Sequence, residues 1–420
     1  MIITKRKTIF FIILLFTALQ FLILYIFKYT PYPDCGGYIK LAKECISQGQ
    51  YLYPTEIQIK ELPFIWNLGS INILIFSLRF FDSITPVLIL YSLMKGCTAL
   101  FVYLISKKLT NKKTAIISLL IYVLYPANYG ESTSVLSELP FIFFNLAGIS
   151  LALCNKHFFC GMLMAVGNWF RPMSMIFLIS TILYLLWNKS SKKILTTLLG
   201  YIISIMIIGG VHFIYSGKFI FQAKTGWMAL MQYSWDNDKE RSQDYALFEK
   251  SDPMYCDESK LDCVEKDLLW RSNFIIWLKN NVFEYFRQIP EKFVRMYVSD
   301  NVNFCTFIKD KNKKEYMYEE LSMESLIKDF PSYSFAQILT FINLIYYYVL
   351  LILFVIGTIF FYKRKSLGSM IMPISLVFVG TIVILLAGHG ESRFHIPFMP
   401  FIIMTVAYYI STKTINNARI

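Results

Sequence analysis

A series of long apolar segments limits the fold of this chain more than any other feature. The first of them, Thr8 to Phe27, is about 20 residues long and follows three consecutive basic residues. A helix of that length spans the roughly 30 Å of hydrocarbon in a bilayer. The segment lacks the short apolar core and the small-residue exit of a cleaved signal peptide, so we interpret it as a membrane anchor.

Nine further segments have the apolar character of membrane helices. They are residues 84–106, 114–128, 136–154, 158–170, 173–187, 194–215, 334–362, 370–387 and 396–411. Together with the first segment, they predict an all-α polytopic membrane protein with about ten transmembrane helices. The composition agrees, because 56% of the 420 residues are hydrophobic and only 16% are charged, outside the range of soluble domains.

The charges are segregated in a way that predicts the topology. If the N-terminus lies inside the cell, basic residues gather in the inner segments, while the 28 acidic residues fall outside or at the outer ends of helices. This asymmetry is the usual signal of membrane orientation. It predicts cytoplasmic N- and C-termini in a cell membrane, and it explains the net charge of +13 without a nucleic-acid partner. A crossing at residues 62–81 would invert this pattern, so we expect that segment to lie along the outer leaflet.

Three parts follow from this topology. Residues 1–216 form an N-terminal transmembrane module with a first outer loop at 28–83, residues 217–331 form an outer, extracytoplasmic region, and residues 332–420 form a C-terminal transmembrane bundle. The outer region has helical periodicity and many aromatic residues between 260 and 298. This pattern fits amphipathic helices at the level of the lipid headgroups, and it fits a small packed helical cap equally well.

Five of the eight cysteines fall on the predicted outer side. They are Cys35, Cys45, Cys256, Cys263 and Cys305. Disulfide bonds between these cysteines can form if that compartment is oxidising, and Cys256 and Cys263 are the closest pair within the large outer region. The four histidines are scattered, and the sequence contains no metal-binding pair of the CxxC type.

The stretch "YPDCGGYIKLAKECISQGQYLYP", residues 32–54, predicts a short amphipathic helix in the first outer loop. Apolar residues recur on one helical face from Tyr38 onward, and Gly49 and Tyr51 mark the end of the helix. Asp34 stands at its start. A carboxylate there either caps the helix, stabilising it by about 1 kcal/mol, or provides a chemical group at the membrane surface.

Lys95 lies well within a predicted crossing, where a charge costs about 2.5 to 3.5 kcal/mol on insertion scales. It should therefore face a cavity or a partner. Three readings remain open: phosphate or sugar binding, snorkelling to the surface, and pairing with Glu138 or another acid.

Four stretches together resemble the GT-C superfamily of glycosyltransferases, which includes dolichyl-phosphate-mannose protein mannosyltransferases and aminoarabinose transferase-like enzymes. In the first loop, the residues that match are Asp34, Tyr38, Ala42, Gly49 and Tyr51. "VLSELPFIFFNLAGISLAL" has the family's Ser-Glu pair at Ser137 and Glu138, and "GNWFRPMSMIFLI" has its Arg-Pro turn at Arg171 and Pro172. "ESRFHIPFMPFI" is similar to the last outer loop, with matches at Glu391, Arg393, Pro397 and Pro400. Protein mannosyltransferases have two adjacent acids in the first loop, whereas Cys35 follows Asp34 here.

The resemblance implies transfer of a sugar from a polyprenyl-phosphate carrier to a lipid, glycan or protein acceptor on the outer face, with inversion. A hydroxyl acceptor needs a base, which contributes roughly 10²- to 10⁴-fold, and Asp34 is our candidate. The candidates for the donor phosphate are Arg393, Lys95, Arg171 and His395, and those for the acceptor or a divalent cation are Glu131 and Glu138. The resemblance gives Tyr38, Gly49, Tyr51 and Glu391 structural roles in the motifs.

Each of these candidates also has a plain structural interpretation. Arg393 could anchor a helix at the interface, His395 could be a structural histidine, and Arg171 could cap a turn. The main alternative function is a polytopic transporter, or a flippase or polymerase for lipid-linked glycans. A transporter would place its ionisable residues near mid-bilayer and would have paired broken helices, whereas most candidates here lie at the outer boundary. The sequence does not identify the sugar, the acceptor, the oligomeric state or a requirement for metal.

Overall fold

The structure is a computed structural model that describes residues 2–235, 260–300, 302, 335–364 and 367–417. Within these residues, helices are the regular structure, and the only strand-like pairing is an isolated bridge between Ile65 and Lys224. The predicted all-α class is confirmed. Within the predicted outer region 217–331, residues 236–259, 301 and 303–331 lie outside the described residues, and with them Cys256 and Cys305.

The helices of the N-terminal half begin with one long helix and continue through a layer of short ones. Their bounds are α1 Ile2–Phe27, α2 Pro33–Ser47, α3 Glu56–Glu61, α4 Leu68–Phe81, α5 Thr85–Leu109, α6 Lys112–Leu124, η1 Pro126–Tyr129, η2 Glu131–Thr133, α7 Glu138–Leu153, α8 His157–Phe170, α9 Ser174–Trp187 and α10 Ser191–Ser216.

The second half adds an outer set of helices and a C-terminal bundle. Their bounds are α11 Gly226–Trp235, α12 Cys263–Asn280, α13 Val282–Arg287, α14 Ile289–Tyr297, α16 Phe335–Lys363, η6 Leu367–Ser369, α17 Ile371–Leu386, η7 Ser392–Phe398 and α18 Met399–Asn417.

All ten segments predicted to cross the membrane are mainly helical, but their lengths differ. Five described helices are long and apolar enough to span a bilayer, within residues 7–27, 85–109, 191–216, 338–363 and 392–413. Helices α6 to α9 and α17 have only 13 to 16 residues each. At 1.5 Å per residue they are about 20 to 24 Å long, short of the hydrocarbon thickness. The chain is a multi-pass membrane protein, and the count of ten crossings stays a prediction.

The connection between α6 and α7 is bent into the protein. The 3₁₀ turns η1 and η2 meet α7 at a bend of 114°. Four consecutive polar side chains here are buried: Glu131, Ser132, Thr133 and Ser134. Buried polar groups need partners, and Gln20 of α1 supplies two, through its bonds with Ser132 and with the Asn128 carbonyl. The connection between α6 and α7 therefore places polar side chains in the interior of the protein.

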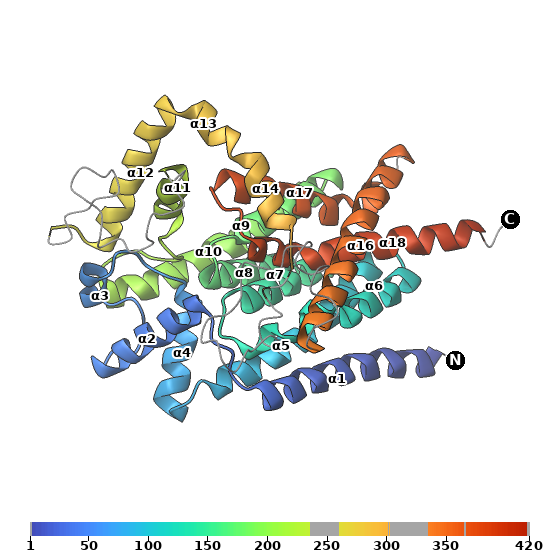
Figure 1. Cartoon of the computed structure of the whole chain (residues 1–420), viewed down its shortest axis with the longest axis horizontal. Helices are drawn as coiled ribbons and strands as arrows, with labels where there is room; N and C mark the ends of the chain where they lie inside the picture. The colour runs from blue at the N-terminus through green and yellow to red at the C-terminus, as the bar shows by residue number, and fades with distance from the viewer. Residues whose placement is uncertain (1, 236–259, 301, 303–334, 365–366, 418–420) are drawn as a thin grey trace.

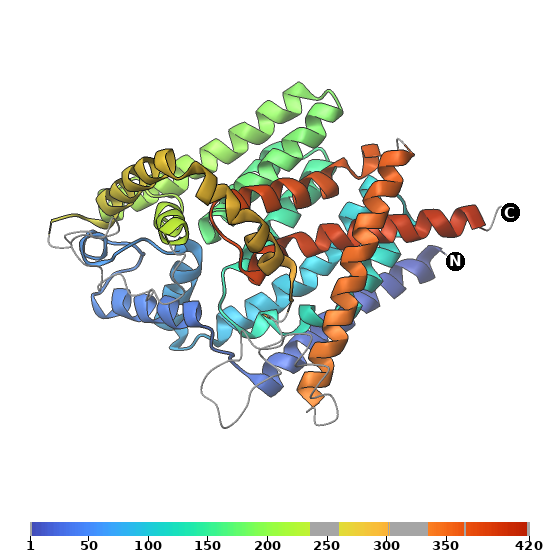
Figure 2. The same ribbon diagram turned by 45° about the horizontal axis from the view of Figure 1, so that its top comes forward.

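The two termini lie at the same end of the molecule (Figure 1). Helices α2, α3, α11 and α12 gather at the end opposite the termini, and the 45° turn in Figure 2 leaves this arrangement unchanged. Helix α4 runs across the direction of α1 (Figure 1), and its position along the outer leaflet stays a prediction. Helices α2 and α3 of the predicted first outer loop thus share one end of the protein with α11 and α12.

Helices α8 and α10 pack closely because two glycines remove the side chains between them. A Cβ atom on Gly161 would lie 2.0 Å from the carbonyl oxygen of Thr197, and one on Gly200 would lie 2.0 Å from that of Phe158. Small residues at such contacts are typical of helix pairs in membranes. Helix α8, which packs against α10 in this way, ends at the turn that carries Arg171.

The outer helices enclose a small core of their own. Met228 and Met231 of α11 pack against Trp270, Phe274 and Tyr285 of α12 and α13. The aromatic residues expected at the headgroup level thus build a packed cap, although Phe283 is 81% exposed. The outer cysteines that the structure describes, Cys35, Cys45 and Cys263, are free and buried.

Candidate active site

Asp34 and Arg393 meet in an ion pair although 359 residues separate them in sequence. Nη1 of Arg393 donates to Oδ2 of Asp34 at 2.5 Å, and the two side chains are 28% and 31% exposed. Asp34 lies in the first turn of α2, where a carboxylate interacts favourably with the helix dipole. The start of α2 has no side-chain cap, so Asp34 does not take the capping role that the sequence left open.

The loop before α18 presents Arg393. Glu391 begins the 3₁₀ helix η7, and its Oε2 accepts from Nε of Arg393 at 2.7 Å. The preceding Gly390 lies against α14, since a Cβ there would approach Cα of Lys292 to 2.8 Å. The guanidinium is therefore held by two carboxylates, from α2 and from its own loop. Among the described residues, these are its only hydrogen-bond acceptors, which leaves further N–H donors directed elsewhere.

A second cation lies nearby in a buried network. Arg171 forms an ion pair with Glu138, with side-chain exposures of 9% and 4%, and its Nη1 lies 3.4 Å from the hydroxyl of Ser137. Asn67 donates from Nδ2 to this hydroxyl at 3.0 Å and to the Tyr38 hydroxyl at 2.7 Å. The predicted Ser-Glu pair and Arg-Pro turn therefore meet, and they connect to the helix that carries Asp34.

Phe394 links the two arginines. The guanidinium carbon of Arg171 lies 4.8 Å from the centre of its ring and that of Arg393 lies 5.6 Å from it. The imidazole of His389 stacks on the same ring at 4.4 Å between ring centres. Burial is the main cause that lowers the pKa of His389 to about 4, with Glu391 acting against it and the nearby arginines acting with it, so this imidazole is neutral at pH 7.

The Tyr38 hydroxyl is held in its neutral form. Burial raises its pKa well above the ordinary value, and the negative charges of Asp34 and Glu138 act in the same direction. It therefore serves as a hydrogen-bonding group in the network. Behind it, the indole of Trp66 packs edge-on at 5.3 Å between ring centres and lies on Gly37, where a Cβ would be 1.9 Å from the ring.

Lys95 and Glu131 pair with each other in the interior. Their side chains are 5% and 2% exposed, and Nζ of Lys95 also donates to Oδ1 of Asn128 at 2.9 Å. The nitrogen lies 5.5 Å from the centre of the Tyr122 ring. Of the three alternatives open from sequence, which included pairing with Glu138 or another acid, pairing describes Lys95, and its partner is Glu131 in η2.

His395 is also enclosed. It is fully buried, Nδ1 lies 2.8 Å from the carbonyl oxygen of Met296, and Nε2 lies 3.3 Å from Oδ1 of Asp300. Nδ1 is thus hydrogen-bonded to the backbone, whereas Nε2 lies beside a carboxyl group without a hydrogen bond to the described residues. This arrangement separates His395 from Arg393, although both belong to η7.

Gly49 and Tyr51 lie at the far end of α2, about 22 Å along the helix from Asp34. Gly49 has a φ of +73° and ends the helix in a left-handed conformation that favours glycine. Tyr51 is 65% exposed and stacks under the guanidinium of Arg79 at 3.8 Å. These two residues fold the loop, and the structure does not bring them to the site.

The three acids that were candidates for chemistry are each bound to a cation, and so is Glu391 of the last-loop motif. Asp34 and Glu391 bind Arg393, Glu131 binds Lys95, and Glu138 binds Arg171. Within the described part of the chain, no three His, Cys, Asp or Glu side chains gather as metal ligands. The residues present therefore do not fit a preformed site for a divalent cation.

Sequence reasoning missed Asn67, His389 and Phe394 as members of the site. Phe394 lies within the matched motif of the last outer loop, so its position next to Arg393 was available as a signal. Asn67 had no such signal, because its role depends on how the loop between α3 and α4 returns to α2.

One segment of the chain matches the sequence model of a known protein family. Residues 71–215 match the model of a family described as dolichyl-phosphate-mannose-protein mannosyltransferase. The resemblance to GT-C glycosyltransferases is confirmed over this segment, which includes Lys95, Glu131, Glu138 and Arg171 but not Asp34 or Arg393. A search of curated proteins finds no significant sequence match.

Two similar solved structures are both oligosaccharyltransferases of the archaeon Archaeoglobus fulgidus. One is AglB in complex with an inhibitory peptide and a dolichol-phosphate, with 9% identity and a TM-score of 0.47 over 99% of this chain and 51% of that one. The other is an apo form, with 11% identity and a TM-score of 0.47 over 99% and 52%. The chain spans about half the length of these proteins.

Proposed function

We propose that this protein is a membrane glycosyltransferase that moves a sugar from a polyprenyl-phosphate carrier to an acceptor hydroxyl, with inversion at the anomeric carbon. The contact between Asp34 and Arg393 carries the proposal, because it joins a carboxylate and a guanidinium from distant loops at a partly exposed position. The family match of residues 71–215 supports the same reaction class. Lipid, glycan and protein all fit as acceptor.

Asp34 is the proposed general base. A carboxylate within hydrogen-bond reach of the attacking hydroxyl removes its proton as the new glycosidic bond forms, which contributes roughly 10²- to 10⁴-fold. One carboxylate suffices for a direct displacement, and no covalent sugar intermediate forms. The bond that breaks joins the anomeric carbon to the phosphate oxygen, and the carrier phosphate leaves with that electron pair.

Arg393 is the proposed ligand of the carrier phosphate. Guanidinium binds phosphate oxygens through two parallel N–H donors, and a preorganised donor to a developing negative charge is worth roughly 10²- to 10³-fold. Without substrate, Arg393 donates to Asp34 and Glu391. When the phosphate arrives, it competes with Asp34 for the same guanidinium. The phosphate thus releases the Asp34 carboxylate for the hydroxyl, which couples donor binding to activation of the base.

Arg171 and Glu138 are proposed to shape the site rather than to bind metal. Glu138 neutralises Arg171, and the pair holds Ser137 and, through Asn67, the Tyr38 hydroxyl. Arg171 also lies over Phe394, beside Arg393. It therefore packs next to the proposed phosphate position, while its own hydrogen bonds stay within the protein.

Lys95 and His395 are proposed as structural residues, in place of the phosphate-binding roles expected for them. Glu131 neutralises Lys95 in the interior, and both ring nitrogens of His395 face protein oxygens. A phosphate at Lys95 would break this buried pair, and a phosphate at Nε2 of His395 would lie against the Asp300 carboxyl group. Breaking such a pair is strongly unfavourable.

We further propose that the site faces outward from the cytoplasmic membrane, with both termini in the cytoplasm. The positive-inside pattern supports this orientation, as does the position of both termini at the end opposite α2 and α12 (Figure 1). A reporter fused after Tyr362 tests it. Reporter activity restricted to the cytoplasm is the expected result, and an outward-facing reporter would reverse the assignment.

The reaction itself is tested with purified protein in lipid nanodiscs, supplied with radiolabelled polyprenyl-phosphate sugars and an envelope extract as acceptor. We expect release of polyprenyl phosphate from one of the donors. Arg393→Ala should raise the KM for the donor by at least tenfold and leave the KM for the acceptor within twofold. Equal changes in both constants would count against a phosphate contact, and no release from any donor would reject the reaction class.

A further inference from the structure

The imidazole of His395 packs against the rings of Tyr297 and Tyr347, at 5.7 and 5.0 Å between centres. Nδ1 faces the carbonyl oxygen of Met296, which can only accept a hydrogen bond, so Nδ1 is the donor. Nε2 lies 3.3 Å from Oδ1 of Asp300 and makes no hydrogen bond to the described residues. The Asp300 carboxyl group is thus held in the interior beside His395.

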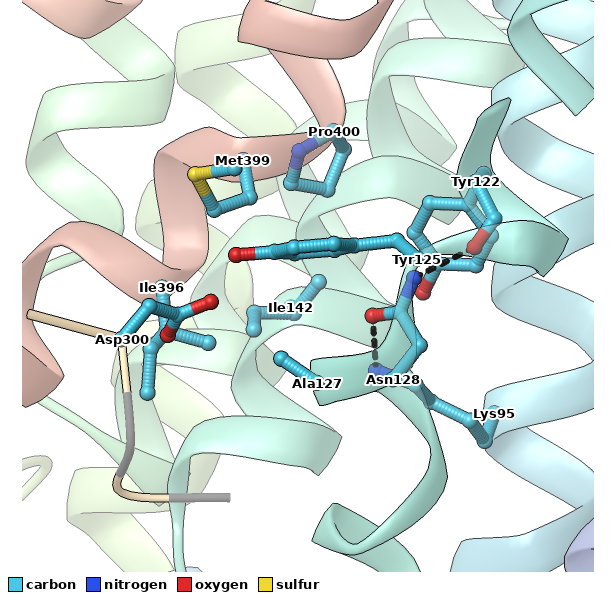
Figure 3. A pocket seen from close by; sticks show the side chains of 10 residues that line it. All are labelled: Lys95, Tyr122, Tyr125, Ala127, Asn128, Ile142, Asp300, Ile396, Met399 and Pro400. Atoms are coloured by element: carbon cyan, nitrogen blue, oxygen red, sulfur yellow. Dashed lines mark hydrogen bonds between the residues drawn. The ribbon is translucent and has the colours of Figure 1, made fainter. Parts of the chain in front are cut away.

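Asp300 also borders a small cavity of about 10 Å³, which has room for about one water molecule. Figure 3 shows Tyr125 reaching across this cavity with its hydroxyl toward Asp300. Tyr125 is 2% exposed and Asp300 is 1% exposed. Neither the Tyr125 hydroxyl nor the Asp300 carboxyl group makes a hydrogen bond to the described residues, although both are buried. Buried polar groups are nearly always satisfied by protein or by ordered water.

The polar groups around the cavity decide which ligand it takes. Lys95 at one side is neutralised by Glu131. At the other side, the Tyr125 hydroxyl can donate and accept a hydrogen bond, and the Asp300 carboxyl group can accept one. A single small molecule that both donates and accepts hydrogen bonds fits these two groups, and the cavity has room for about one water.

The residues that line the cavity are also connected to η7, the 3₁₀ helix that carries Arg393. Asn343 of α16 donates to the backbone carbonyl of Asp300 at 2.8 Å and accepts from the backbone N–H of Ala127 at 3.1 Å. It thereby ties both walls of the cavity together. His395 lies two residues after Arg393 in η7, so the position of one constrains the position of the other.

We propose that this cavity binds one water molecule between the Tyr125 hydroxyl and the Asp300 carboxylate, and that Tyr125 and Asp300 act as positioning residues for Arg393. The water and Asp300 orient His395, His395 fixes η7, and η7 holds the guanidinium of Arg393 at Asp34. The consequence for catalysis rests on the proposed function. The binding of water and the ordering of η7 do not.

Hydrogen–deuterium exchange of residues 392–398 tests the ordering without any substrate. Tyr125→Phe and Asp300→Asn should each speed exchange of these amides by roughly tenfold, about the loss of one hydrogen bond to a charged group. Combining them should add little, because either change alone removes the water bridge. The matched control is Thr405→Val, whose buried hydroxyl bonds only within its own helix, and it should leave η7 unchanged.

Unchanged exchange in both variants, or fully additive effects in their combination, would overturn the proposal. Exchange that slows on replacing choline by sodium or potassium in the buffer would show a bound cation and would also overturn it. If the purified protein transfers no sugar, the proposed function fails while the exchange result still decides this proposal. If it does transfer, Asp300→Asn should raise the donor KM severalfold with kcat nearly unchanged, and should have no further effect in Arg393→Ala.

Discussion

The buried pair of Lys95 and Glu131 allows a quantitative test of whether these two charges stabilise each other in the interior. Glu131→Gln removes one charge and leaves Lys95, only 5% exposed on its side chain, with neutral partners. Breaking a buried pair in this way costs about 3 to 5 kcal/mol. Lys95→Met costs a similar amount, because it leaves the Glu131 carboxylate uncompensated.

The double substitution should be far milder than the sum of the two. Replacing both members of a buried pair with neutral residues of similar volume is often neutral or stabilising. Oδ1 of Asn128 then loses its donor, which costs about 1 to 3 kcal/mol. We expect a net loss of about 1 to 2 kcal/mol, against about 6 to 10 kcal/mol if the single effects added.

The assay is denaturant unfolding of the purified variants in detergent micelles, followed by tryptophan fluorescence. Losses that add in the double variant would refute the pairing. Transfer activity then separates the two roles of Lys95. A double variant with near wild-type stability should keep its activity, whereas loss of donor turnover in a stable double variant would place Lys95 on the phosphate.

Three further predictions use pairs or sites with a clear physical contrast. Gly37→Ala places a Cβ 1.9 Å from an indole ring and should reduce transfer at least tenfold, while Gly36→Ala, with open space around it, should not. Gly200→Ala in α10 should lower the unfolding midpoint because its Cβ would meet a backbone oxygen at 2.0 Å, whereas Gly210→Ala in the same helix should raise it slightly through helix propensity. Burial lowers the pKa of Lys292 to about 8, so the unfolded state binds more protons between about pH 8 and 10.5, and the free energy of unfolding should rise with pH across that window. A Lys292→Met variant should lose this rise, and an equal rise in the variant would contradict the assignment.

The sequence predicted the helices and the two charged motifs of the site, because both depend on local patterns. Apolar length predicted α1, α5, α10 and α16, and the family motifs placed Asp34 and Arg393 at the same boundary. That these two side chains touch could not be derived from one sequence, since it depends on how the helices pack.

The partners of the other charged residues were beyond sequence reasoning for the same reason. Lys95 could have paired with any acid that reached it, and the turn η2 that carries Glu131 inward has no helical or strand periodicity. His395 lies in a motif shared with Arg393, yet its nitrogens face α14 and Asp300. A motif therefore locates a group along the chain but does not tell which of its residues face the substrate.

The most direct test of the central claim is the turnover of Asp34→Asn with saturating polyprenyl-phosphate sugar. Asparagine keeps the size of the side chain and can still accept a hydrogen bond from Arg393, but it cannot remove a proton from the acceptor. We predict intact folding, retained donor binding and a kcat at least 10²-fold lower than that of the wild type. Turnover at the wild-type rate would remove Asp34 from the mechanism and contradict the account.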